Sequence, residues 1–123
     1  MEQKTILIVE DETINAMAMK SYLETKGYAI IKIIKSGEEA IEYLQDNSPS
    51  LILMDIFLAD KISGIDVINT VYKCKEIPVI FITACNDIET MSQVKKMPNY
   101  HLISKPFNFE SLENEIHAVI YSK

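Results

Sequence analysis

Short apolar runs alternate with amphipathic stretches along the whole chain. Ile, Val and Leu occupy consecutive positions in five runs, at residues 5–9, 28–34, 51–54, 78–82 and 101–104. Consecutive apolar positions are typical of strands that are buried on both faces, as in a parallel sheet covered by helices. The pattern therefore predicts five central strands.

The stretches between these runs carry helical periodicity and helix end signals. Ser36 and Glu39 have the spacing of a capping box, and Asn108 is placed to cap the last helix. A helix over 64–74 and a helix opened by residues 86–89 complete the set. The apolar positions at helical spacing are Ile14, Met17, Ala18 and Tyr22, followed by a stop at Gly27; Ala40, Ile41 and Leu44; Ile65, Ile68, Val71 and Tyr72; and Leu112, Ile116, Val119 and Ile120.

Five strands and five helices in strict alternation predict an α/β fold with a doubly wound parallel sheet. We expect the flavodoxin-like strand order 2-1-3-4-5, with right-handed crossovers between parallel strands. The length of 123 residues suits one domain, so residues 1–123 are taken as a single unit. Ligands of such sheets bind at the carboxyl ends of the strands.

Composition and charge narrow the classes of function. The 12 basic residues are all lysine, and the net charge is −6. Nucleic-acid-binding domains usually carry a basic patch, so no direct contact with nucleic acid is expected. No apolar run approaches the roughly 20 residues of a membrane helix, and the first residues do not resemble a signal peptide. For these reasons no membrane contact is expected. Since Cys74 and Cys85 do not make a disulfide framework, we expect a cytoplasmic protein.

Polar and charged side chains follow four of the five predicted strands. Glu10 and Asp11 follow the first strand, Asp55 the third, Thr83 the fourth and Lys105 the fifth. In the order 2-1-3-4-5 these strands are neighbours, so the side chains would converge. Carboxylates about 4 Å apart repel by roughly 4 kcal/mol at an effective dielectric constant near 20, so the cluster needs a cation. Oxygen ligands with room for water suit Mg²⁺.

The same groups fit phosphoryl transfer to a carboxylate. An ionised Asp55 has its nucleophilic oxygen ready and would become an aspartyl phosphate. A phosphoryl group in transfer spreads its charge over three equatorial oxygens. Mg²⁺, the Thr83 hydroxyl and the Lys105 ammonium are the expected partners of these oxygens.

Four segments at the strand ends resemble the receiver domain of two-component response regulators. They are ILIVEDE at 6–12, LMDI at 53–56, IFITA at 80–84 and SKPF at 104–107, in the order and approximate spacing of the family. The resemblance implies Mg²⁺-dependent transfer of a phosphoryl group to Asp55 from a sensor histidine kinase or phosphotransfer protein. It also implies a regulatory domain rather than an enzyme. Phosphorylation would change the surface of helix four, strand five and helix five, which contacts an output protein or a fused domain.

Position by position, the resemblance assigns a role to each candidate residue. Asp11 is similar to the direct metal ligand, Glu10 to its neighbour that reaches the ion through water, and the backbone carbonyl of Phe57 to a further ligand. Thr83 is similar to the switch hydroxyl. Lys105 is similar to the phosphate-binding lysine, whose bond to the following proline is commonly cis in the family.

The sequence departs from the family pattern at two places. Leu102 stands where the family often has an aromatic residue, which leaves packing by Leu102 or a substitute contact by Tyr100 to couple the switch. Residues 97–99 replace the small residues that usually precede the fifth strand. Phe57 and Cys85 lie two positions after Asp55 and Thr83, so we expect both to border the site.

Other interpretations of these residues stay open at the level of sequence. Residues 10–12 also suit the acidic start of a helix, and Asp60, Lys61 and Asp66 are interpreted as solvated charges. A Mg²⁺-dependent phosphatase would place its nucleophile after the first strand. A flavin-binding protein of similar topology would need a phosphate loop rich in Gly and hydroxyl groups there. A receiver that has lost phosphorylation is the remaining alternative.

Overall fold

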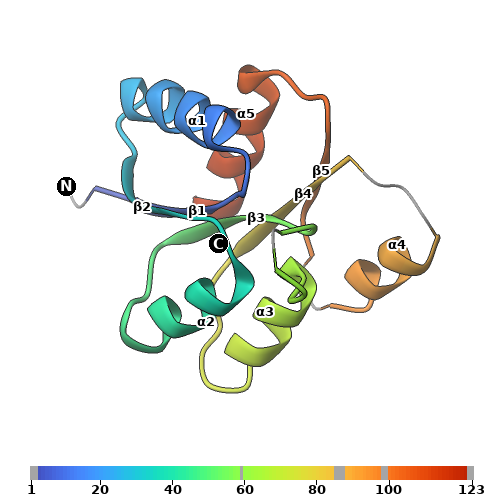
Figure 1. Ribbon diagram of the computed structural model, residues 1–123. Helices are drawn as coiled ribbons and strands as arrows, with labels where there is room; N and C mark the ends of the chain where they lie inside the picture. Colours follow the sequence, from blue (N-terminus) through green and yellow to red (C-terminus); the bar gives the residue numbers. More distant parts are fainter. Residues whose placement is uncertain (1–2, 59, 85–87, 98–99, 122–123) are drawn as a thin grey trace.

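The computed structural model describes residues 3–58, 60–84, 88–97 and 100–121 (Figure 1). Within these residues the strands form one five-stranded sheet in the order β2-β1-β3-β4-β5, and each neighbouring pair is parallel. This order confirms the prediction of a doubly wound sheet. The strands are β1 Thr5–Val9, β2 Ala29–Ile34, β3 Leu51–Asp55, β4 Val79–Thr83 and β5 Leu102–Ser104.

Helices cover both faces of the sheet. On one face α1, Thr13–Thr25, lies beside α5, Phe109–Ile120 (Figure 1). The other face is covered by α2, Gly37–Asp46, and α3, Gly64–Val71, with α4, Ile88–Lys95, beyond them. In the part of the chain that the structure describes, no helix is long and apolar enough to cross a membrane.

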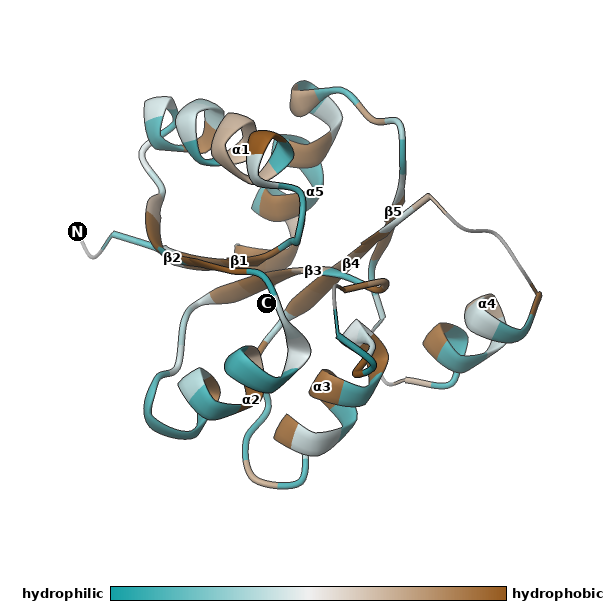
Figure 2. Ribbon diagram, viewed as in Figure 1, coloured by the Kyte–Doolittle hydropathy of each residue, from teal (hydrophilic) through white to brown (hydrophobic). Residues whose placement is uncertain are grey.

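The alternation of side chains along each strand divides the core into two clusters. On β1, Leu7 faces the α2–α3 side, whereas Ile6 and Ile8 face the α1–α5 side. All three are fully buried, and Figure 2 shows the central strands of the sheet as mainly apolar. Because burying one such side chain stabilises the fold by about 1.5–3 kcal/mol, the sheet is the rigid scaffold from which the strand ends project.

Helix α1 packs against the sheet with a different face from the one that its spacing predicts. Ala16, Met19 and Leu23 are buried, whereas Ile14 is 84% exposed and Met17 is 56% exposed. The helix carries apolar side chains around much of its circumference, so spacing alone did not identify the inner face. An apolar surface is left in contact with solvent near the carboxyl edge of the sheet.

Most of the predicted helix ends are confirmed. The Ser36 hydroxyl accepts a hydrogen bond from the Glu39 N–H at 3.2 Å, and the Asn108 side chain accepts one from the Ser111 N–H at 2.7 Å. Gly27 follows α1 with a φ of 92°, a left-handed conformation that favours glycine. Helix α3 ends at Val71 rather than at residue 74, and the predicted cap at 86–87 lies outside the described residues.

Asp60 and Asp66 are helix caps, which corrects their interpretation as solvated charges. The Asp60 carboxylate accepts hydrogen bonds from the Gly37 and Glu38 N–H groups, each at 3.0 Å. Asp66 and Ser63 form a reciprocal capping box at the start of α3, with both bonds at 3.1 Å. The spacing of Ser63 and Asp66 in the sequence could have revealed their capping box. The Asp60 cap could not be recognised in this way, because Asp60 and Gly37 lie 23 positions apart.

Removing the Asp60 cap is expected to destabilise the fold in a pH-dependent way. Hydrogen bonding, first from the Gly37 N–H, lowers the pKa of the Asp60 carboxyl. Its contribution is therefore complete above the unfolded pKa of about 3.9 and is lost as the pH falls through the lower folded value. Urea unfolding should show Asp60→Ala less stable than the unmodified chain by about 1 kcal/mol at pH 7, with the gap shrinking below about pH 4.

Ser36→Ala is the matched control, because it removes the hydroxyl cap of the same helix and that group does not titrate in this range. Its loss of stability should stay constant across the same pH series. If the free energy of unfolding of Asp60→Ala differs from that of the unmodified chain by the same amount at pH 7 and at pH 3, Asp60 is not a charged cap of α2.

Candidate functional site

Two strand ends bring three carboxylates together at the carboxyl edge of the sheet. Asp55 is the last residue of β3, and Glu10 and Asp11 follow β1 directly. The two strands are paired with Val9 opposite Met54. One carboxylate oxygen from each of the three acids lies within 4.8 Å of the others. The residues predicted as metal ligands through their side chains are therefore neighbours in space.

Lys105, which directly follows the edge strand β5, places its ammonium group among these acids. Its Nζ lies 2.9 Å from Glu10 Oε1, 3.3 Å from Asp55 Oδ2 and 3.9 Å from Glu12 Oε1. The Lys105 N–H donates to the Thr83 carbonyl at 2.8 Å, which fixes the start of the loop to β4. The bond from Lys105 to the following proline is cis, as in the family pattern.

Burial makes the charges of this cluster interact strongly. Glu10 is 1% exposed, and burial, together with the neighbouring Asp55, raises the pKa of Glu10 although Lys105 acts in the opposite direction. Burial alone would lower the pKa of Lys105, but the hydrogen bonds and negative charges of Glu10 and Asp55 outweigh it and raise that pKa. The lysine is therefore held as a cation whose charge is shared between two acids.

Thr83 and Phe57 lie at the same edge of the sheet as the acidic cluster. Thr83 is the last residue of β4 and is 1% exposed, and Asp55 pairs with the preceding Ile82 in the sheet register. The Phe57 N–H donates to Asp55 Oδ1 at 3.1 Å, whereas the Phe57 ring is half exposed. Cys85, which was expected to border the site, lies outside the described residues.

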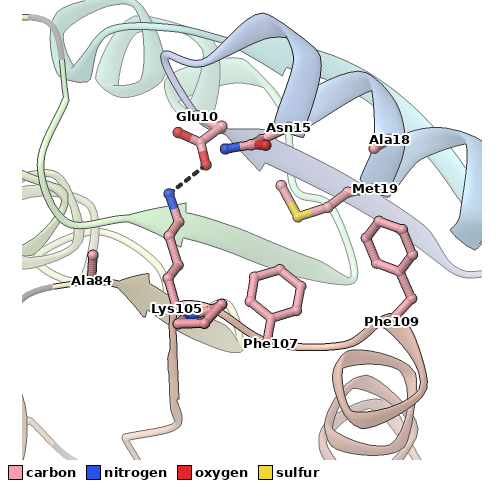
Figure 3. Close-up of a pocket in the computed structure, with 9 residues that line it drawn as sticks. Glu10, Asn15, Ala18, Met19, Ala84, Lys105, Phe107 and Phe109 are labelled. Atoms are coloured by element: carbon pink, nitrogen blue, oxygen red, sulfur yellow. Dashed lines mark hydrogen bonds and ion pairs between the residues drawn. The ribbon is translucent and has the colours of Figure 1, made fainter.

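A cavity of about 360 Å³ opens beside the ion pair of Glu10 and Lys105 (Figure 3). It lies between α1 and the segment that follows β5, and much of its wall comes from Met19, Phe107 and Phe109. This cavity could not be predicted from the sequence, because its wall combines residues of α1 with residues almost 90 positions later in the chain.

The donor set fits a divalent cation of the magnesium type. All the converging ligand atoms are carboxylate oxygens, which are the donors that Mg²⁺ and Ca²⁺ prefer. Three carboxylates and the single ammonium of Lys105 leave two negative charges among these residues, which one divalent cation would neutralise. The side chains that would hold it are those of Asp11 and Asp55, with Glu10 within reach.

The residues near β5 show how the family pattern is altered here. Leu102, at the position that is often aromatic, is half-buried and packs against the core cluster of the α2–α3 side. Tyr100 is 42% exposed. His101 Nδ1 lies 3.5 Å from Glu115 Oε1 on α5, whereas His117 is exposed on the same helix. The acidic cluster found among the described residues consists of Glu10, Asp11 and Asp55, so both histidines lie outside it.

The sequences of known regulatory proteins align with most of this chain. The regulator PhyR of Methylorubrum extorquens, named for its induction in the phyllosphere, is 40% identical over 103 residues, which are 83% of this chain and 38% of that protein. Response regulator RR06 of Streptococcus pneumoniae is 32% identical over 115 residues, 94% of this chain and 52% of that protein. The chain therefore spans about half or less of the length of these curated relatives.

Solved structures show the same architecture. The signal receiver domain of a modulated diguanylate cyclase from Desulfovibrio desulfuricans matches with a TM-score of 0.88 and 29% identity, over 98% of this chain and 95% of the other. The REC domain of the PhyR response regulator from Erythrobacter litoralis matches with a TM-score of 0.84 and 29% identity, over 98% of this chain and 92% of the other. The family model for the response regulator receiver domain matches residues 6–117. The chain therefore belongs to the family of response regulator receiver domains.

Proposed function

We propose that this chain is a signalling switch in which Asp55 accepts a phosphoryl group from a phosphohistidine. The donor would be a sensor histidine kinase or a phosphotransfer protein, and acceptance of phosphoryl groups is the function of the receiver family. The observation that carries the proposal is the convergence of Asp55 with Glu10, Asp11 and Lys105 from three separate strand ends.

In the proposed reaction a carboxylate oxygen of Asp55 attacks phosphorus as the bond from phosphorus to the imidazole nitrogen breaks. The imidazole leaves with the electron pair of that bond and takes up a proton. Lys105 stands 3.3 Å from Asp55 Oδ2, so it can neutralise a phosphoryl oxygen bound there. The Thr83 hydroxyl is proposed to bind a second oxygen.

The acidic cluster has a complementary role in this proposal. A magnesium ion held by Asp11, Asp55 and the backbone carbonyl of Phe57 would supply positive charge that lets the carboxylate approach an anionic phosphoryl group. Glu10 would orient water next to it. The support is the cluster of oxygen donors and the two negative charges that Lys105 leaves uncompensated.

The proposed partner surface lies beside Asp55. Ile14 and Met17 of α1 are exposed, and the adjacent cavity is walled partly by Phe107. An apolar surface around a charged reaction centre suits a partner that delivers its phosphoryl group by docking a helix. We propose that residues of α1 select this partner.

The proposed output is a change in the surface formed by α4, β5 and α5. Among the described residues α4 buries Val94 and leaves Ile88, at its start, 88% exposed, whereas α5 buries three residues, so α4 is less firmly packed than α5. Leu102 would transmit the change by packing.

We propose that residues 1–123 act as one receiver unit, in the cytoplasm, on a separate output protein or a fused domain. The exposed free thiol of Cys74 supports a reducing compartment.

Asp55→Asn is expected to abolish phosphorylation. The chain should gain one phosphoryl group when incubated with Mg²⁺ and a small acyl phosphate, as measured by intact mass, because the carboxylate is the nucleophile. The adduct should be absent from Asp55→Asn and from samples without the metal. Asp66→Asn, which alters a carboxylate at the start of α3, should keep it.

Three results would contradict this prediction. An adduct on Asp55→Asn would place the acceptor elsewhere. Turnover of many donor molecules without a trapped adduct would indicate a phosphatase. A flavin in the purified protein would indicate a flavin-binding function.

Phe57 is expected to slow the loss of the phosphoryl group. An apolar ring two positions after Asp55 offers no hydrogen bond to a water molecule that attacks phosphorus. In Phe57→Asn an amide could orient that water, and a hydrogen bond worth about 1 kcal/mol would speed hydrolysis by about fivefold. The rate is measured as the decay of the phosphorylated mass. Tyr121→Asn, beyond the far end of α5, should decay like the unmodified chain, and slower decay of Phe57→Asn would contradict the prediction.

A further inference from the structure

The loop between β3 and α3 carries Phe57, whose carbonyl is the proposed backbone ligand. The ends of this loop are fixed by the Ile56 N–H, which donates to the Ile82 carbonyl at 3.2 Å, and by the Gly64 N–H, which donates to the Ile56 carbonyl at 2.8 Å. The Phe57 ring is half exposed, so its packing does little to fix the backbone. The Phe57 N–H donates to Asp55 Oδ1 at 3.1 Å, and Leu58 packs against the core cluster of the α2–α3 side. The position of the carbonyl depends on these contacts and on what holds the rest of the loop.

The middle of the loop is attached to α2 by two independent contacts. Asp60 accepts hydrogen bonds from the Gly37 and Glu38 N–H groups at 3.0 Å, one on each carboxylate oxygen. Ile62 packs directly on Gly37, where an added Cβ would lie 2.7 Å from Ile62 Cγ2 and 2.8 Å from the Ile62 carbonyl oxygen. The loop and the first turn of α2 therefore lie in contact through both polar and apolar groups.

The Asp60 contact is well matched to the start of a helix. The first N–H groups of α2 have no partners within the helix, and the helix dipole favours a negative charge there. The lowered pKa of Asp60 agrees with a carboxylate that is stabilised in its charged form. Ser36 satisfies the next N–H group, that of Glu39.

We propose that Asp60 is a positioning residue, which holds the β3–α3 loop against α2 so that the Phe57 carbonyl stays in place to bind the cation. This inference rests on the proposed function. Mg²⁺ demands nearly octahedral geometry with short bonds, so a ligand displaced by about 0.5 Å binds poorly. Loss of a residue that orients a metal ligand typically weakens metal binding by about 10-fold to 100-fold.

The alternative is that Asp60 only stabilises α2. Ser36→Ala separates the two roles, because Ser36 caps the same helical turn from within α2 and should affect stability alone. Glu38→Gln removes one negative charge from the same turn and so controls for a loss of long-range attraction. Asp60→Asn keeps an acceptor oxygen for one of the two N–H groups and should give an intermediate result.

The test is a calorimetric titration of the full 123-residue chain and its variants with Mg²⁺ at neutral pH. Asp60→Ala should bind Mg²⁺ about tenfold more weakly than the unmodified chain, the low end of the range for such residues. Ser36→Ala and Glu38→Gln should stay within about twofold, a difference of about 0.4 kcal/mol. Amide exchange without metal should be faster at Phe57 in Asp60→Ala than in Ser36→Ala.

Equal Mg²⁺ affinity in Asp60→Ala and the unmodified chain would overturn the inference. An equal loss of Mg²⁺ affinity in Ser36→Ala would also overturn it, because the effect would then come from the stability of α2. An equal loss of Mg²⁺ affinity in Glu38→Gln would overturn it too, because the effect would then come from the lost negative charge. An unmodified chain that binds no Mg²⁺ would instead contradict the proposed function itself.

Discussion

Repulsion among the carboxylates of Glu10, Asp11 and Asp55 governs the carboxyl edge of the sheet. Their oxygens lie within 4.8 Å of one another, and Glu10 and Asp55 are almost fully buried. At an effective dielectric constant near 20, each close pair costs about 4 kcal/mol. Lys105 offsets part of this cost through its contacts with Glu10 and Asp55, and we propose that the remainder is the basis for binding a cation and then a phosphoryl group.

The strand ends made this cluster predictable from the sequence. Each apolar run ends at a polar residue, and the order 2-1-3-4-5 is enough to place Asp55 between the acids after β1 and the lysine after β5. The inner face of α1 was not predictable in the same way, because Ile14 and Met17 are as apolar as the residues that pack on the sheet. Their exposure depends on how the helix docks, which local spacing does not encode.

Contacts between distant segments were the other part that sequence did not reveal. Asp60 caps a helix whose first residue, Gly37, lies 23 positions earlier in the chain, and the cavity near Lys105 joins α1 to the segment after β5. Both features connect the acidic cluster and Lys105 to surfaces beyond them. One leads through the β3–α3 loop to α2, and the other leads to the exposed apolar side of α1, where a partner would dock.

Anomalous diffraction from crystals soaked with Mn²⁺ can show whether a divalent cation completes the cluster of Glu10, Asp11 and Asp55. Manganese takes the same oxygen ligands as magnesium and can be located by its own scattering. We expect one anomalous peak that contacts the carboxylates of Asp11 and Asp55 and the carbonyl of Phe57. A cluster without a peak at saturating Mn²⁺, or with the ion bound only elsewhere, would contradict it.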